Sequence, residues 1–140
     1  MIVYLVRHAR AGKRSEWEGD DRLRPVDERG RLQAEALVAQ LGGRDFRRIV
    51  SSPYVRCVQS VEPLSQARGI PVEAREELAE GAGREAGVRL LLAADAPVVA
   101  SVHGDLVEEL LGSKLKKGAT AVLELREGGL DVLERLAPPA

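Results

Sequence analysis

The sequence predicts an α/β protein, a three-layer α/β/α sandwich with a mostly parallel central sheet. Short apolar runs rich in β-branched residues, typical of buried strands, occur at residues 2–6 and 98–102, and residues 45–50 lead into a further short strand. Segments with the apolar spacing of helices lie between them, and this alternation favours a parallel sheet covered on both faces. A chain of 140 residues is expected to form one domain, residues 1–140.

The first half of the chain contains two predicted helices. Asp27 is expected to be the N-cap of a helix that ends at Gly42-Gly43. Its expected apolar face comprises Leu32, Ala36, Leu37 and Leu41. The next helix is expected to begin at residues 51–53, with a serine as N-cap and proline in the first turn. Pro63 falls within this second helix, where proline tends to kink or shorten it.

The second half continues the alternation and then changes to antiparallel pairing. A turn and a short edge strand are predicted at 69–74, and a helix at 84–94. After the strand at 98–102, a helix with an apolar face is expected to end at Gly112. Residues 119–125 and 130–136, separated by Gly128-Gly129, predict a β-hairpin. The long polar loop at 11–25 is the exception, and such loops are often functional.

Composition narrows the class of protein. The chain is 44% apolar and 31% charged with a net charge of −1, so no broad attraction to nucleic acid or anionic membrane is expected. Cys57 is the only cysteine, which excludes an internal disulfide and fits a reducing compartment. No signal peptide and no membrane-spanning run is recognisable, so a cytoplasmic location is expected.

The two histidines of the chain both follow predicted strands. His8 stands beside Arg7 after the first strand, and His103 follows the strand at 98–102. Ligands of open α/β sheets bind at the carboxyl ends of strands, so these residues and Arg56 are expected to converge there. Guanidinium groups suit phosphoryl oxygens, and a neutral imidazole can attack phosphorus. Nearby cations favour the neutral imidazole because they oppose a further positive charge.

Three motifs in this order resemble the histidine phosphatase (phosphoglycerate mutase-like) superfamily. They are Arg7-His8-Ala9, Ser51-Ser52-Pro53-Tyr54-Val55-Arg56 and Val102-His103-Gly104. The short chain and Arg24-Pro25-Val26 before Gly30 are similar to the compact SixA-like phosphohistidine phosphatases. Ala9 stands where the family usually has glycine. The resemblance implies a phosphoglycerate mutase-like fold across nearly the whole chain.

The resemblance also implies roles for individual residues. His8 would be the nucleophile that becomes phosphorylated, and Arg7, Arg56 and His103 would bind the phosphoryl group. The family often has an acidic proton donor after a leucine in the middle of the chain. Glu80 in Leu78-Ala79-Glu80 fits, and Glu77 is a second candidate.

Other residues are candidates for contact with substrate. Arg10, Lys13 and Arg14 follow the first motif and would extend its positive field, although such residues are commonly solvated. Trp17, the only tryptophan, either covers an edge of the core or lines the mouth of the site. Both interpretations of Trp17 remain open.

The resulting interpretation is a metal-independent phosphatase without a cofactor, acting through phospho-His8. A phosphohistidine protein phosphatase of the SixA kind is the first expectation for substrate. The alternative is a small-molecule phosphatase acting on a nucleotide, polyphosphate or sugar phosphoester. Trp17, Gly19-Asp20-Asp21 and Arg24-Pro25 resemble phosphatase-like domains fused to Nudix hydrolases, which keeps nucleotides open. The partner would be a phosphorylated protein or small molecule.

Two other classes of function compete with this one. A metal enzyme would use His8, His103 and Asp20 or Asp21, but two histidines without a recognised ligand spacing are a weak signature. A non-catalytic phosphate-binding module would not need every catalytic residue type. The presence of both histidines with Arg7 and Arg56 argues against this second class.

Overall fold

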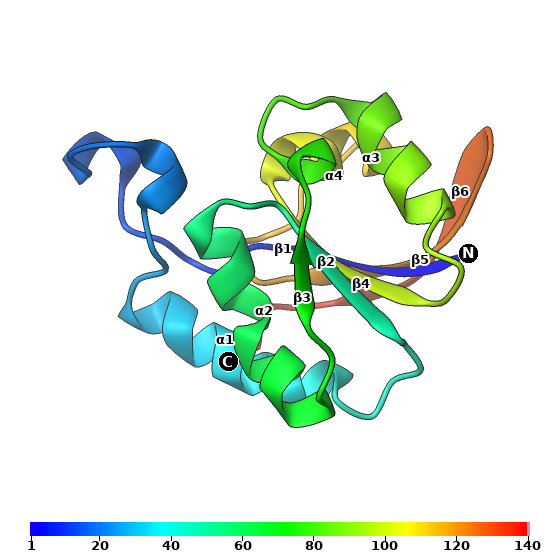
Figure 1. Cartoon of the computed structure of the whole chain (residues 1–140), viewed down its shortest axis with the longest axis horizontal. Helices are drawn as coiled ribbons and strands as arrows, with labels where there is room; N and C mark the ends of the chain where they lie inside the picture. Colours follow the sequence, from blue (N-terminus) through cyan, green and yellow to red (C-terminus); the bar gives the residue numbers. More distant parts are fainter. Residues whose placement is uncertain (140) are drawn as a thin grey trace.

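Six strands form a single mixed sheet in the computed structural model, which describes residues 1–139 (Figure 1). The strand order is β3-β2-β4-β1-β5-β6. The strands are β1 (Ile2–Arg7), β2 (Arg48–Ser51), β3 (Val72–Ala74), β4 (Val98–Val102), β5 (Thr120–Arg126) and β6 (Gly129–Leu136). The pairs β1–β4, β4–β2 and β2–β3 are parallel, and β5 and β6 add antiparallel strands at one edge. The predicted edge strand and C-terminal hairpin are both confirmed.

Four helices cover the two faces of the sheet and complete the predicted three-layer sandwich (Figure 1). They are α1 (Glu28–Leu41), α2 (Val55–Arg68), α3 (Arg84–Leu92) and α4 (Gly104–Leu111). The side chains of β1 explain the two layers. Val3 and Leu5 belong to the apolar cluster with α3 and α4, whereas Tyr4 and Val6 belong to the cluster with α1 and α2. Alternate side chains of a strand point to opposite faces, so both faces of β1 are buried.

Helix α1 begins where the sequence predicts, and its buried face agrees with the prediction at Leu37 and Leu41 but not at Leu32. The Asp27 carboxylate accepts a hydrogen bond from the Gly30 amide at 2.8 Å, as an N-cap does. Leu32, expected on the apolar face, is 51% exposed. The buried residues are Gly30, Ala34, Leu37 and Leu41. Gly30 is required because a Cβ there would lie 1.8 Å from the carbonyl oxygen of Arg10.

The start of α2 was predicted wrongly. Ser51 is the last residue of β2, and α2 begins at Val55. Tyr54 occupies the N-cap position, but its side chain makes no capping hydrogen bond. The hydroxyl of Ser52 accepts a hydrogen bond from the Tyr54 amide at 3.2 Å and contacts the imidazole of His103 at 2.8 Å. Its side chain therefore holds His103 rather than capping the helix. Pro63 does not end α2, which continues to Arg68.

The 11–25 loop projects from the body of the molecule on the side of the carboxyl ends of β1 and β2 (Figure 1). It contains two short 3₁₀ turns, η1 (Arg14–Glu16) and η2 (Asp21–Leu23). A third turn, η3 (Glu76–Leu78), follows β3. Ala11 and Val26 form an isolated antiparallel bridge at the base of the loop. Within residues 1–139 no helix has the length and apolar character needed to span a membrane.

Candidate active site

Strand pairing brings the two histidines together. β1 and β4 are parallel neighbours in which Arg7 is opposite Val102, so His8 and His103 follow paired positions. Their ring centroids are 5.6 Å apart and their planes are inclined by 68°. β2 lies on the other side of β4, and the helix after it carries Arg56. The predicted convergence of the strand ends thus has a direct cause in the sheet order.

His8 is 7% exposed and has a defined tautomer. Its Nδ1 lies 2.8 Å from the carbonyl oxygen of Ala9. A carbonyl oxygen only accepts, so Nδ1 carries the hydrogen and Nε2 keeps its lone pair. Burial lowers the pKa of His8 to about 3 against the opposing effect of the Ala9 carbonyl, and the charges of His103, Arg56 and Arg7 add to the lowering. His8 is therefore neutral at pH 7, with Nε2 as the available nucleophilic atom.

Arg56 is 1% exposed and is paired with the 11–25 loop. Its Nη1 donates to the Asp21 carbonyl oxygen at 2.9 Å, and its Nη2 donates to the Asp21 carboxylate at 3.1 Å. The same carboxylate accepts from Arg24 Nε at 2.9 Å. Burial opposes ionisation of Asp21, but the Arg24 hydrogen bond and the Arg56 charge dominate and lower its pKa. Asp21 is thus the counter-ion of a buried guanidinium.

His103 is 1% exposed and is held from the side of β2. Its Nε2 contacts the Ser52 hydroxyl at 2.8 Å, while its Nδ1 lies 4.0 Å from the Glu80 carboxylate. Burial and then the Arg56 charge lower the pKa of His103 to about 4, although nearby carboxylates oppose them. Both imidazoles of the pair are therefore neutral at pH 7.

Arg7 lies against the first turn of α4. Its Nη1 donates to the Leu115 carbonyl oxygen at 2.6 Å. A Cβ at Gly104 would lie 3.0 Å from Nη2 of Arg7, so a glycine after His103 allows the guanidinium to approach the helix. This contact gives a physical reason for the glycine in the third motif.

Of the two acidic candidates, Glu80 lies beside the other site residues. Its Oε2 is 3.8 Å from Arg56 Nη2, and both of its oxygens accept from Arg14 Nη2 at 3.1 Å. This pairing raises the pKa of Arg14. Glu77 instead accepts a hydrogen bond from Arg75 at 2.8 Å and does not line the cleft at His8 and Arg56. Glu80 is therefore the acidic residue that the structure brings to the candidate site.

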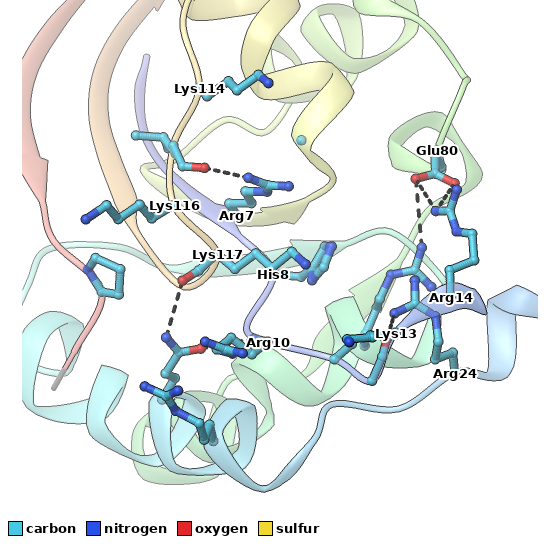
Figure 2. Close-up of a pocket in the computed structure, with 18 of the residues that line it drawn as sticks. Arg7, His8, Arg10, Lys13, Arg14, Arg24, Glu80, Lys114, Lys116 and Lys117 are labelled. Carbon is cyan, nitrogen blue, oxygen red and sulfur yellow. Dashed lines mark hydrogen bonds and ion pairs between the residues drawn. The ribbon is translucent and has the colours of Figure 1, made fainter. Parts of the chain in front are cut away.

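A cleft of about 1180 Å³ opens at these residues (Figure 2). Among the predicted site residues, those that line it are Arg7, His8, Arg10, Lys13, Arg14, Arg56 and Glu80. His103 is buried next to His8 and does not line it. Trp17 is 37% exposed, donates its indole hydrogen to the Asp20 carbonyl oxygen at 2.9 Å, and lines a smaller neighbouring pocket.

Several residues that position the site were not predicted to do so. Asp21 pairs with Arg56, Ser52 holds His103, and the Ser60 hydroxyl accepts from the Ala9 amide at 2.7 Å. The sequence gives no spacing rule that links Asp21 to Arg56, because the contact depends on how the 11–25 loop folds. Within residues 1–139, no group of three or more His, Cys, Asp or Glu side chains is arranged to hold a metal ion. Asp21, one proposed metal ligand, faces arginines instead.

Comparisons with known proteins agree with these motifs. The chain is 38% identical to an 8-oxo-(d)GTP phosphatase of Mycolicibacterium smegmatis over 155 aligned positions. That alignment covers 98% of this chain but 48% of the relative, so the chain spans about half its length. SixA of Agrobacterium tumefaciens is similar in structure, with a TM-score of 0.78, 26% identity and 98% of each chain covered.

A second solved structure is the protein histidine phosphatase SixA complexed with tungstate. It has a TM-score of 0.77 and 25% identity, and the match covers 99% of this chain and 97% of that one. The sequence model of the histidine phosphatase superfamily, branch 1, matches residues 3–90. The motifs, the sheet that brings them together and this match agree, and the chain belongs to the histidine phosphatase superfamily.

Proposed function

We propose that the protein is a metal-independent phosphatase that carries the phosphoryl group on Nε2 of His8. The observation that supports this most directly is the protonation state of His8. Its imidazole is neutral, Nδ1 donates to the Ala9 carbonyl oxygen, and Nε2 is available beside the cleft. In the first step a bond forms from Nε2 to phosphorus while the bond to the leaving oxygen breaks, and its electron pair stays on that oxygen. In the second step water attacks phosphorus, Nε2 departs with its electron pair, and phosphate is released.

Arg7, Arg56 and His103 would stabilise the charge that develops on the phosphoryl oxygens. The terminal nitrogens of two guanidiniums provide forked donors of the kind that match phosphoryl oxygens. His103 is neutral in the unliganded protein and would donate from Nδ1, because Nε2 is occupied by Ser52. These donors are preorganised, since the sheet and the contacts of Arg7 and His103 fix them before substrate arrives.

Glu80 would transfer the protons that the two steps require. Its carboxyl group can give a proton to the leaving oxygen and later take one from the attacking water. The position of Glu80, 4.0 Å from His103 and 3.8 Å from Arg56, supports this role. Its ion pair with Arg14 would have to loosen before Glu80 accepts a proton, so we infer that substrate competes for Arg14.

We propose a nucleotide-type phosphoester or phosphoanhydride as the substrate. The size of the cleft and its many cationic residues suit a polyanion larger than one phosphoryl group, and the relative at 38% identity is named for action on 8-oxo-(d)GTP. A phosphohistidine protein is the second candidate. It is favoured by the SixA structures at 25–26% identity.

The phosphoenzyme can be trapped directly. Brief incubation with a ³²P-labelled donor, followed by alkaline quenching, should give label that is stable to base, lost in acid and located on His8. His8→Ala should give none, whereas Arg47→Ala, which removes an exposed arginine at the far end of β2, should label normally. Label on a serine, or full turnover by His8→Ala, would refute the mechanism.

Glu80→Gln distinguishes the two substrates. Phosphohistidine has a good leaving group and needs little acid, whereas an alkyl phosphoester needs a positioned proton donor. We expect the substitution to reduce kcat/KM for a nucleoside monophosphate by about 10²-fold and to leave phosphohistidine hydrolysis within about 3-fold. If the wild-type protein hydrolyses phosphohistidine far faster than any nucleotide tested, the nucleotide assignment is wrong and the SixA-like one replaces it.

A further inference from the structure

The cleft has two chemically different ends (Figure 2). At one end Glu80 is paired with Arg14, and Asp21 is paired with Arg24 and Arg56. Five cationic residues of the lining, which we call the basic wall, are Arg10, Arg29, Lys114, Lys116 and Lys117. Of these, Arg10, Lys114, Lys116 and Lys117 lie on the side away from Glu80 in Figure 2. Within residues 1–139, none of these five takes part in an ion pair. Carboxylates therefore pair directly with the cations at the Glu80 end, whereas the basic wall has no ion pair of its own, although Asp105 and Glu108 also line the cleft.

The basic wall is attached to the catalytic residues through the backbone. Gly118 donates its amide to the carbonyl oxygens of Arg7 and His8, at 3.0 and 3.1 Å. Gln33 joins two members of the wall: its Oε1 accepts from the Arg10 amide at 3.0 Å and its Nε2 donates to the Lys117 carbonyl oxygen at 3.3 Å. These bonds hold the backbone of Arg10 and Lys117 in place relative to the backbone of His8.

Lys117 extends across the cleft in the direction of His8 (Figure 2). Burial lowers the pKa of Lys117, and the charges of nearby arginines, Arg10 among them, lower it further. Like charges held together raise the free energy of the empty cleft, and an anion bound between them would relieve that repulsion. Arg10 and Lys117 are both exposed, so an anion can reach them from solvent.

We propose that Arg10 and Lys117 form a subsite for a second phosphate of the substrate, next to the phosphoryl group that reacts with His8. This inference rests on the proposed phosphatase function and narrows it to diphosphates and longer phosphate chains. A single phosphoryl group can occupy Arg7, Arg56 and His8 but leaves the basic wall without a partner. A second phosphate, one bridging oxygen away, would lie between the reacting group and the basic wall.

The reaction of such a substrate balances without a further reactant. Nε2 of His8 bonds to the terminal phosphorus, and the bond from that phosphorus to the bridging oxygen breaks. The electron pair stays on the bridging oxygen, which leaves as part of the second phosphate. Arg10 and Lys117 are positioned to stabilise the negative charge that this phosphate gains.

The test compares substrates that differ in the second phosphate. Kinetics are measured on para-nitrophenyl phosphate, which has one phosphoryl group, and on guanosine diphosphate, which has two. Losing one charge-assisted contact should raise KM for the diphosphate by about 10-fold in Arg10→Ala and in Lys117→Ala, and by about 100-fold in the double variant. In each variant, KM for the aryl phosphate should rise much less than KM for the diphosphate, since the phosphoryl group of the aryl phosphate does not reach the subsite.

Inhibition gives an independent readout. Inorganic pyrophosphate should inhibit aryl phosphate turnover at least about 10-fold more tightly than orthophosphate in the wild-type protein, and the double variant should lose this difference. Lys117→Arg should retain it, because the charge is kept. Arg47→Ala, which removes one positive charge far from the cleft, is the matched control and should behave as wild type.

Each failure has a separate meaning. If the wild-type protein turns over neither of these substrates nor a phosphohistidine protein, the proposed phosphatase function is wrong. If it hydrolyses the aryl phosphate but pyrophosphate and orthophosphate inhibit equally, the subsite is refuted and the phosphatase function stands. If the variants weaken hydrolysis of a phosphohistidine protein and leave the diphosphate unchanged, the basic wall binds an acidic protein and the proposal is overturned.

Discussion

The two buried neutral histidines should make the folded protein sensitive to mild acid. Both have an ordinary pKa of 6.5, which burial lowers to about 3 for His8 and about 4 for His103. Below pH 6.5 the unfolded chain takes up protons that the folded protein does not, so the free energy of unfolding falls with decreasing pH. One pH unit of this difference is worth about 1.36 kcal/mol, so each histidine should lose ~2 kcal/mol of stability between pH 8 and pH 5.

His8→Asn isolates one half of this effect. The asparagine amide can still donate to the Ala9 carbonyl oxygen, but it does not titrate. Urea unfolding at pH 8 and pH 5, at constant ionic strength, should show a loss of ~4 kcal/mol for wild type and ~2 kcal/mol for His8→Asn. The carboxylates titrate mainly below pH 5 and contribute equally to both proteins. An equal loss in the two proteins, or a wild-type loss below about 1 kcal/mol, would refute the reasoning.

Three further outcomes are expected. Arg56→Lys should lower kcat for para-nitrophenyl phosphate by roughly 10²-fold, because an ammonium lacks the fork of the guanidinium; near-normal kcat would exclude Arg56 from the transition state. Gly30→Ala should destabilise the fold by about 1–3 kcal/mol in thermal unfolding, since its Cβ would meet the Arg10 carbonyl oxygen, whereas Gly43→Ala has open space and should be nearly neutral. Activity should survive exhaustive chelation, and vanadate should compete with substrate; restoration of lost activity by a divalent ion would favour a metal mechanism instead.

Much of the fold was predictable because its signals are local. The apolar runs at β1 and β4 indicate strands that are buried on both faces. Asp27 marks a helix start through its capping side chain, and Gly112 marks a helix end through its left-handed backbone conformation. The meeting of His8 and His103 was also predictable, since parallel strands place their carboxyl ends at one edge. These inferences need the chain direction and the strand order, but no knowledge of side-chain packing.

The remaining errors arise where a polar side chain has a distant partner. The neighbouring residues in the sequence suggest that Ser52 caps a helix, yet its hydroxyl forms a hydrogen bond with the imidazole of His103. Leu32 fits a helical repeat but is exposed, and Gly30, which lies against the Arg10 backbone, completes the buried face with Ala34, Leu37 and Leu41. Trp17 allowed two interpretations, and its pocket depends on the path of the 11–25 loop. Local propensity cannot supply any of these contacts.

The pairing of Asp21 with Arg56 connects the stability of the empty site with its chemistry. A guanidinium that is 1% exposed is costly to bury unless an anion accompanies it, and Asp21 fills that need while the cleft is empty. The phosphoryl group of a substrate would require the same Nη2 donor. When substrate binds, its phosphoryl group therefore replaces the Asp21 carboxylate at Arg56 or shares Arg56 with it. The lost contact with Asp21 offsets part of the attraction between Arg56 and phosphate. We expect this competition to weaken retention of the phosphate product more than binding of the transition state, whose greater charge Arg56 and Arg7 would stabilise together.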